Sequence, residues 1–409
     1  MTLDRRAMLI FAGAEAAGAS GIAASLSGAA AARSGDPALP AATWPLRLTD
    51  FMTPEMLDDV RRGTLKVDCA PALQAAFDTV SGVHRSSFET GGKLHVPAGR
   101  YLLATPVNFS WRNDQRVFDD GDMRRLTIEG DGQGNTVFFY RGDPGRPAVE
   151  VRGFKSSPGH GDGVALRLTI SGLQIVRDLA TRHRGSGLSL EGAALIRLLD
   201  MEVSAFDVNI DMVDVLRVYM ESVHINGGRI GLQARGNNFS NPNVYKLVHC
   251  SLSGNRVAGA KIRNGCNISF DTCAIEGNGH DRQRAAASLW FDGGPSQGGS
   301  AGSIVNCYFE NNFAAADVLL DWNDEAGGTM KVTACTFQRT SAARAALHHL
   351  LLKSESAPLR AHVDSCAFKG FGDYVPNAQR SAVASKGRAV QVHYTANLFQ
   401  YEEEAPANA

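Results

Sequence analysis

The sequence lacks several features that would quickly assign it to a functional class. Its formal net charge is −1, so it has no basic field of the kind that nucleic-acid binding needs. Its 43 glycines follow no Gly-X-Y period, and its 7 cysteines form no CxxC pair of the kind that binds zinc. No segment after the N-terminal region is apolar over enough residues to span a bilayer. We therefore expect neither a nucleic-acid partner nor a membrane span.

The sequence does contain many short apolar alternations separated by Gly, Asn and Asp. With 409 residues, 44% of them hydrophobic, the chain can bury a large core. Alternation with a period of two is typical of strands, which favours an all-β fold rich in turns. One segment alone has convincing helical spacing, CAPALQAAFDTV at 69–80, and it places Leu73, Ala76 and Phe77 on one face.

The N-terminus has the order of regions found in an export signal. Two arginines, Arg5 and Arg6, precede a weakly apolar, Ala/Gly-rich run over 7–32, whose last small residues suit cleavage before Arg33. This segment resembles a twin-arginine signal and predicts export by that pathway to the periplasm or the extracellular space. A plain N-terminal tail is the alternative, because Glu15 interrupts the apolar run.

Five cysteines mark a repeat in the second half of the chain. Each is followed, after one spacer, by a large apolar residue, as in HCSL at 249–252 and NCYF at 306–309. They are Cys250, Cys273, Cys307, Cys335 and Cys366, separated by 23, 34, 28 and 31 residues. The same position is filled upstream by Leu173, Met201 and Val223, and downstream by Asn397.

Each repeat carries two short strands joined by a bend, and a third strand with its own register. The third strands are VEVRG (149–153), LSLEG (188–192), VNIDM (208–212), IGLQA (230–234), AKIRN (260–264), LWFDG (289–293), VLLDW (318–322) and LLLKS (350–354). Three strands per irregular repeat predict a single-stranded parallel β-helix of about nine coils, whose repeats must stack to bury their apolar faces. The crossover rule predicts that it is right-handed.

This fold explains the cysteines without any chemistry. Equivalent inward positions of successive coils lie about 4.8 Å apart, so like residues stack in a ladder where a thiol acts as a small apolar group. Side chains of adjacent coils run parallel, a geometry that suits few disulfides, although a bridge between some rungs stays open.

The region before the coils resembles the start of helical-repeat proteins of the pectate-lyase superfamily, of the pectate lyase 3-like or rhamnogalacturonase–epimerase-like kind. The resemblance lies in the helix at 69–80, in GGKLHVPAGRYLL at 91–103 and in LTIEGDGQGNTVF at 126–138, and with the coils it covers roughly residues 45 to 400. It implies that the helix caps the N-terminal end of the β-helix and that the substrate is a polysaccharide. It does not fix the reaction, because lyases, glycoside hydrolases, epimerases and non-catalytic proteins share this architecture.

These observations divide the chain into four parts. We expect a signal peptide over 1–33, an N-terminal segment with the capping helix over 34–90, the parallel β-helix over 91–400 and a disordered tail over 401–409.

The third strands of the coils present two columns of outward side chains. Aligned on their shared pattern, the first column is Glu150, Ser189, Asn209, Gly231, Lys261, Trp290, Leu319 and Leu351, and the second is Arg152, Glu191, Asp211, Gln233, Arg263, Asp292, Asp321 and Lys353. Polar residues concentrate between Asp211 and Asp321, which predicts a sugar-binding groove. In it, the flat indole of Trp290 would pack on a pyranose ring, and amides and carboxylates would bind hydroxyls.

The stretch GAKIRNG contains the first candidates for catalysis. Lys261 and Arg263 lie two apart on a strand, so both point to one face and could hold the carboxylate of a uronic acid. The stretch resembles the Arg-Ile-Lys strand with which polygalacturonases bind substrate, with the two cations exchanged. However, Ala205 and Phe206 stand where that family has paired aspartates, and Arg229 where it has a histidine, so we do not expect a polygalacturonase proper.

Two enzymatic interpretations stay open, of which we favour the first. In a lyase, Lys261 would remove the C5 proton of a uronate, and Arg263 would stabilise the anion that forms beside the carboxylate. In a glycoside hydrolase, Asp292 and Asp321, one coil or about 5 Å apart, would act as the paired carboxylates. Candidate substrate-binding residues for either reaction are Asp211, Asn209, Arg229, Gln233, Trp290 and His280, the last in a loop at the end of a coil.

Plainer interpretations also fit the outward charges. Charges on neighbouring coils, such as Arg263 and Asp292, can pair across the rungs of a solvated sheet and have no function. A non-catalytic glycan-binding or structural β-helix protein would present the same groove. The pattern requires no cofactor, although aspartates on neighbouring coils could hold Ca²⁺. The expected partner is an acidic polysaccharide or oligosaccharide, and the resemblance allows a homotrimer.

Overall fold

The computed structural model describes residues 45–83, 92–110, 124–153, 166–178, 184–236, 240–281, 283–293, 300–322, 327–339, 348–355, 357–369 and 383–400. These residues belong to one compact unit, Thr43–Ala409. The predicted signal peptide at 1–33 and the predicted tail at 401–409 lie outside the described residues. Among the described helices, none is both long and apolar enough to cross a membrane.

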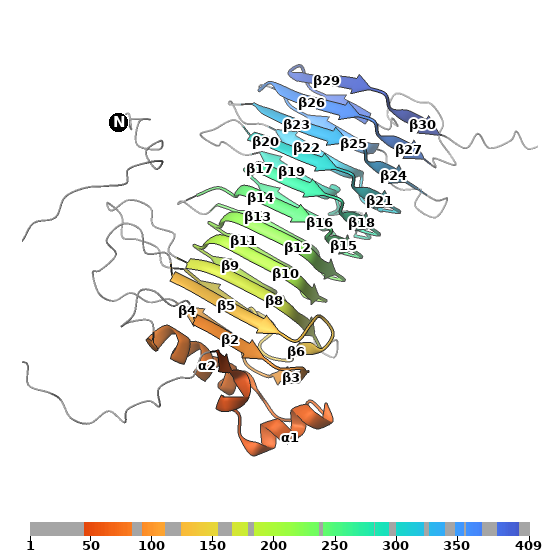
Figure 1. The fold of residues 1–409 in the computed structure, drawn as a ribbon. Coiled ribbons are helices and arrows are strands. Elements are labelled where there is room, and N and C mark those ends of the chain that lie inside the picture. Colours follow the sequence, from red (N-terminus) through yellow and green to blue (C-terminus); the bar gives the residue numbers. More distant parts are fainter. Residues whose placement is uncertain are drawn as a thin grey trace, which may run out of the picture. The chain divides into compact units, whose positions relative to one another are not determined.

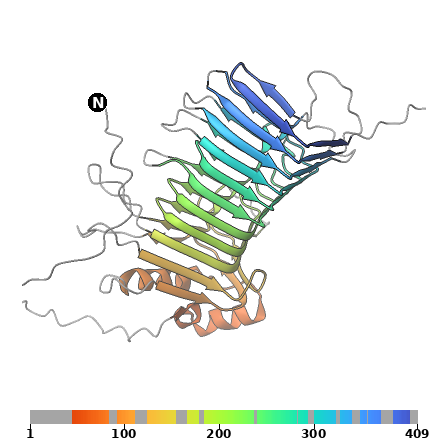
Figure 2. The ribbon, with the colours of Figure 1, turned by 45° about the horizontal axis from the view of Figure 1, so that its top comes forward.

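One parallel sheet, here called sheet B, runs along one side of the stacked coils (Figures 1 and 2). Its ten described strands are β4 (Val107–Ser110), β7 (Val149–Arg152), β9 (Ser186–Glu191), β11 (Val208–Val213), β13 (Ile230–Arg235), β16 (Ala258–Arg263), β19 (Ala287–Gly293), β22 (Ala316–Trp322), β25 (His348–Lys353) and β28 (Val383–Lys386). Each strand pairs only with the strands of neighbouring coils, as a parallel β-helix requires. The expected count of about nine coils was one short of these ten strands.

The second sheet, sheet A, contains the other strands of each repeat. Its strands are β1 (Leu46–Arg47), β2 (Gly92–Val96), β3 (Gly99–Leu103), β5 (Arg124–Gly130), β6 (Thr136–Tyr140), β8 (Leu166–Arg177), β10 (Ala194–Ser204), β12 (Leu216–Asn226), β14 (Asn243–Val248), β15 (Ser251–Ser253), β17 (Cys266–Asp271), β18 (Ala274–Glu276), β20 (Ser300–Val305), β21 (Tyr308–Glu310), β23 (Gly328–Thr333), β24 (Thr336–Gln338), β26 (Leu359–Asp364), β27 (Ala367–Lys369), β29 (Val390–Thr395) and β30 (Leu398–Gln400). Two short strands per repeat were expected, but in three coils they are merged into one continuous strand of 11–12 residues, β8, β10 and β12.

Two α-helices, preceded by the short 3-10 helix η2 (Leu48–Phe51), lie at the N-terminal end of the described residues, where one helix was expected (Figure 1). The expected helix is α2 (Ala70–Val83), and its residues Leu73, Ala76 and Phe77 are buried, as predicted. The side-chain amide of Gln74 donates to the backbone carbonyl of Asn108 and accepts from its N–H, so α2 satisfies the free edge of β4. The capping role that the resemblance implied is confirmed by these contacts.

The helix that the sequence analysis missed is α1 (Pro54–Arg62). Its ends carry ordinary signals: the Thr53 hydroxyl accepts from the N–H of Met56, Pro54 occupies the first turn, and Gly63 ends the helix with φ +64°. It was overlooked because it is only 9 residues long and contributes a single buried residue, Asp59.

The cysteine positions form the predicted ladder on the inside of sheet A. The residue before each cysteine adopts a left-handed conformation with φ between 52° and 54°, which turns the chain between the two strands of the repeat. The thiols are 1–2% exposed, and each donates to the carbonyl two residues earlier at 3.3–3.4 Å. The five ladder cysteines are free thiols. Register places Leu173, Met201 and Val223 in the same column, also as predicted.

A second ladder fixes the turn that leads from sheet A into sheet B. Asn255, Asn278 and Asn312 are fully buried, and the Asn278 and Asn312 side-chain oxygens accept from the backbone N–H of the preceding rung at 3.0 and 2.9 Å. The ladder ends in a buried ion pair in which Arg339 donates to Asp317 at 2.8 Å. Because every rung satisfies the next, the strands of sheet B start at fixed heights.

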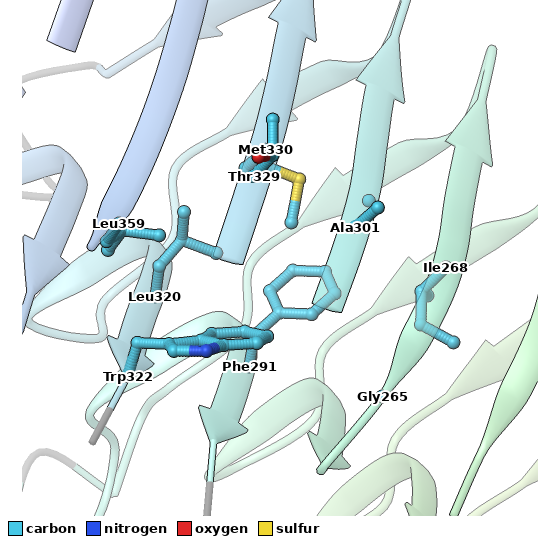
Figure 3. A pocket seen from close by; sticks show the side chains of 10 residues that line it. Gly265, Ile268, Phe291, Ala301, Leu320, Trp322, Thr329, Met330 and Leu359 are labelled. Atoms are coloured by element: carbon cyan, nitrogen blue, oxygen red, sulfur yellow. The ribbon is translucent and has the colours of Figure 1, made fainter. Parts of the chain in front are cut away.

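A small cavity of about 10 Å³ lies in the core beside Gly302, between Phe291, Trp322 and Met330 (Figure 3). A space of this size holds at most one water molecule, so it is not a ligand site.

Candidate active site

The outer face of sheet B carries the residues that the sequence analysis singled out, in two columns set by strand register. The first column is Glu150, Ser189, Asp211, Gln233, Lys261, Trp290, Leu319 and Leu351. The second is Arg152, Glu191, Val213, Arg235, Arg263, Asp292, Asp321 and Lys353.

Two strands were therefore misaligned by two residues. The expected columns contained Asn209 and Gly231 in the first position and Asp211 and Gln233 in the second. In the structure, Asp211 pairs with Ser189 and Gln233 pairs with Lys261, so both belong to the first column. A shift of two residues keeps every side chain on its own face, so the apolar alternation could not reveal the error.

The correction removes Asn209 from the groove. It lies nearer the start of its strand, is fully buried, and donates to the Asn226 carbonyl at 3.0 Å and to the Asn255 side chain at 3.1 Å. Its neighbours in register, Gly231 and Gly259, are small because the asparagine ladder covers this position. Asn209 thus supports the turn and does not face a substrate.

The correction also brings in Arg235, which the sequence analysis missed. Its guanidinium binds Asp211 through two hydrogen bonds of 2.5 and 3.1 Å, and Gln233 donates to the same carboxylate at 3.2 Å. The signal was present in the sequence, because Gly-x-x-x-Arg occurs at both 231–235 and 259–263. Both oxygens of the Asp211 carboxylate are therefore already bound within the protein.

Lys261 occupies the centre of the polar part of this face. Its ammonium lies 3.6 Å from the centroid of the Trp290 ring, one rung away, in cation–π contact. Burial lowers the pKa of Lys261, the carboxylate of Asp292 partly offsets this, and the charges of Arg263 and Arg229 lower it further. The result is a half-buried amine with an enhanced tendency to lose its proton.

The position of Lys261 bears on the role expected for Trp290. The ammonium covers one indole face, so only the opposite face could stack on a sugar ring, and that role stays a prediction. Trp290 also packs against an apolar cluster that contains Leu319 and Leu351. Those two leucines are in the outward first column, yet they are only 2% and 6% exposed. The open, polar part of the outer face therefore extends from β9 to β19.

The second column places one cationic and two acidic candidates at three consecutive rungs. Arg263 is exposed, and within the described part of the chain it makes no hydrogen bond or ion pair. Asp292 and Asp321 face each other in register, one coil apart, as expected. Asp321 forms an ion pair with Lys353 at 3.7 Å.

The two remaining candidates lie near the starts of the sheet B strands. Arg229, directly before β13, is held by Asp207 through two hydrogen bonds of 2.8 and 2.9 Å. His280 is exposed in the turn between β18 and β19, and its ring packs on Phe313 with centroids 4.1 Å apart. Among the described residues, no group of three or more His, Cys, Asp or Glu is arranged to hold a metal ion. Ca²⁺ binding stays a prediction.

No protein-family model and no curated protein matches the chain. Its fold is similar to that of several solved structures. The A-module of mannuronan C-5 epimerase AlgE4 from Azotobacter vinelandii has a TM-score of 0.54 at 14% identity, over 88% of this chain and 98% of that one. ORF18 of Geobacillus virus E2 has a TM-score of 0.55 at 14% identity, over 87% and 61%. The gp42 tailspike of Acinetobacter phage vb_AbaP_AS12 has a TM-score of 0.51 at 12% identity, over 82% and 59%.

These likenesses concern the fold. The chain spans about three fifths of the length of the two viral proteins and nearly the whole length of the epimerase module. It is a parallel β-helix protein, and this architecture is shared by an enzyme named for its action on a polysaccharide and by a phage tailspike.

Proposed function

We propose that the chain cleaves an acidic, uronate-containing polysaccharide by β-elimination on the outer face of sheet B, between β9 and β19. The proposal rests on the surroundings of Lys261. Its amine is half-buried, has a lowered pKa and packs on the Trp290 ring. Beside it lies Arg263, which forms no ion pair within the described residues. A neutral amine next to a carboxylate-binding cation is what proton removal from C5 of a uronate requires.

The proposed reaction assigns one task to each cation. Arg263 binds the uronate carboxylate, and this interaction strengthens as negative charge spreads from C5 into the carboxylate. Lys261 takes the C5 proton, the C4–C5 double bond forms, and the bond between C4 and the glycosidic oxygen breaks. The electron pair stays on that oxygen, which takes a proton from water.

Neighbouring side chains support this arrangement. Trp290 holds the ammonium of Lys261 in place and shields one side of it from water. Gln233, in register with Lys261 on the preceding rung, offers an amide for a sugar hydroxyl. The mannuronan C-5 epimerase module acts, by its name, at the same carbon atom of a uronate. Export over residues 1–33, proposed from the sequence, would bring the protein to polysaccharides outside the cytoplasm.

A glycoside hydrolase is the second candidate, favoured by the register of Asp292 and Asp321. Carboxylates one rung, about 5 Å, apart match the separation used by retaining enzymes. The ion pair of Asp321 with Lys353 suits a nucleophile, and Asp292 would then be the acid. The third candidate is a glycan-binding protein without catalysis.

Product analysis separates the three candidates. The protein is incubated with polygalacturonate, alginate and other acidic polysaccharides, with and without Ca²⁺, while ultraviolet absorbance of unsaturated uronates and the number of reducing ends are followed. A lyase produces both signals, a hydrolase produces reducing ends alone, and a binding protein produces neither.

Two variants assign the residues. Lys261→Ala should abolish the ultraviolet signal, whereas the double variant Asp292→Asn/Asp321→Asn should keep a measurable signal. Reducing ends without unsaturation, lost in the double variant, would replace the lyase proposal by the hydrolase.

A further inference from the structure

The outer face of sheet A carries a set of unpaired cations, here called the cationic stripe. They occupy two neighbouring outward columns between β10 and β26, and they are Arg197, Arg217, Lys246, Lys331 and Arg360. All five side chains are exposed, and none makes an ion pair within the described residues. No described position of these two columns from β10 to β29 is an aspartate or a glutamate.

This segregation is unusual for a chain with a net charge of −1. On sheet B, three outward cations form ion pairs with carboxylates on the same face, as Arg235 does with Asp211 and Lys353 with Asp321. At the N-terminal end of sheet A, Lys93 likewise pairs with Glu129. The cationic stripe begins where such pairing stops, so its charges remain available to an external anion.

The dimensions of the stripe favour a thin, extended partner. From β10 to β26 it extends over seven rungs, whose six spacings add up to about 29 Å, whereas two residues along a strand give it a width of only about 7 Å. The next column on the same face contains Glu221, Asp271 and Asp364. A lipid surface or a nucleic-acid duplex is much wider and would bring negative charge against these carboxylates.

Apolar surface lies within the stripe at its N-terminal part. The Arg197 guanidinium is 5.8 Å from the Tyr219 ring centroid, and the Tyr219 hydroxyl donates to Glu221 at 3.0 Å. These two contacts hold the ring on the outer face of sheet A. Val244, between Arg217 and Lys246, is 48% exposed. A partly exposed ring and an aliphatic side chain among cations suit a chain of sugar rings that carry carboxylates.

We propose that the cationic stripe is a second binding surface for an acidic polysaccharide, on the side of the coil away from the candidate active site. The choice of a polysaccharide over other thin polyanions rests on the proposed function. Such a surface would retain a long chain while another stretch of it, or another chain, occupies sheet B.

The test measures binding without catalysis. In the background Lys261→Ala/Arg263→Ala, which removes the two cations of the candidate active site, the triple variant Arg217→Gln/Lys246→Gln/Arg360→Gln is compared with the matched control Arg61→Gln/Arg146→Gln/Arg388→Gln. The control also removes three exposed positive charges, but from other surfaces of the protein. Retardation is measured in native gels that contain polygalacturonate or alginate, with dextran gels as the neutral reference.

The proposal predicts that the background protein is retarded in an acidic gel, that the stripe variant binds about tenfold more weakly with a shallower dependence on salt, and that the control binds like the background. Equal weakening in both triple variants, or no retardation of the background in any acidic gel, overturns it. Displacement by a single-stranded oligonucleotide at lower concentration than by free polygalacturonate would overturn the choice of partner. These outcomes are independent of whether the unmodified protein forms unsaturated products.

Discussion

The two outer faces of the coil treat their positive charges differently. Half of the outward cations that the structure describes on sheet B form ion pairs with carboxylates of the same face, namely Arg152, Arg235 and Lys353. Lys261 and Arg263, two residues apart on β16, form none among the described residues, although register places Asp292 beside Arg263. Within the described part of sheet A, no cation of the stripe forms an ion pair. In a parallel β-helix, the neighbours of an outward side chain are the residues of its own column on the adjacent rungs and those of the adjacent columns. Whether a cation finds a carboxylate partner therefore depends on which residues occupy these columns. The comparison identifies which charges are free to bind a ligand.

The largest expected effect contrasts two lysines on opposite faces of adjacent coils. Lys261→Ala should lower the rate of β-elimination at least about a hundredfold, because it removes the proposed base. Lys246→Ala, on β14, should leave kcat unchanged, since that residue belongs to the stripe. Initial rates from ultraviolet absorbance check both, and similar losses in the two variants would contradict the distinction between the faces.

A smaller effect separates the paired from the unpaired arginine of sheet B. Arg235→Ala leaves the carboxylate of Asp211 half-buried without its ion pair and should reduce the free energy of unfolding by about 1 kcal/mol, a modest figure because the arginine is 36% exposed. Arg263→Ala breaks no ion pair and should leave stability unchanged while raising KM. Urea denaturation measures the first effect and steady-state kinetics the second. An equal loss of stability in both variants would show that Arg263 is also held within the fold.

The smallest expected effect is a change in pH dependence. The lyase rate should rise with pH as Lys261 loses its proton. Because burial lowers the pKa of Lys261, the midpoint of this rise should lie at a lower pH than the pKa of an ordinary lysine. The carboxylate of Asp292 raises this pKa, so Asp292→Asn should move the rise in kcat/KM to still lower pH. A shift to higher pH would contradict the assignment, and complete loss of activity would favour the hydrolase.

The fold was predictable because the same pattern of residue types recurs in every repeat, as a parallel β-helix requires. The cysteines are irregularly spaced, but each follows a bend between two strands, and aligning the bends aligns the cysteines. In the structure, the residue before each of these cysteines has a left-handed conformation, so all the bends share one geometry. The amphipathic spacing of Leu73, Ala76 and Phe77 predicted the capping helix for the same reason. The short helix α1 was not predicted because it buries a single residue, which is too few to produce an amphipathic pattern in the sequence.

The site was only partly predictable. Which residues point outward follows from alternation, and this placed Lys261, Arg263 and the pair Asp292 and Asp321 correctly. Which rung neighbours meet does not follow, because a two-residue shift preserves alternation, and so Arg235 was missed. The cover that Lys261 places on Trp290 depends on side-chain conformation and needed the structure.

The measurement that tests the central claim most directly is the reactivity of the Lys261 amine in the folded protein. An amine-specific reagent is applied across a range of pH, and the modified peptides are quantified by mass spectrometry, with the exposed lysines of the same chain as internal references. We predict that, once corrected for accessibility, Lys261 begins to react at lower pH than these references, and that Asp292→Asn moves its midpoint lower still. A midpoint equal to theirs would contradict the account, because Lys261 would then be an ordinary surface lysine and not a base prepared by its surroundings.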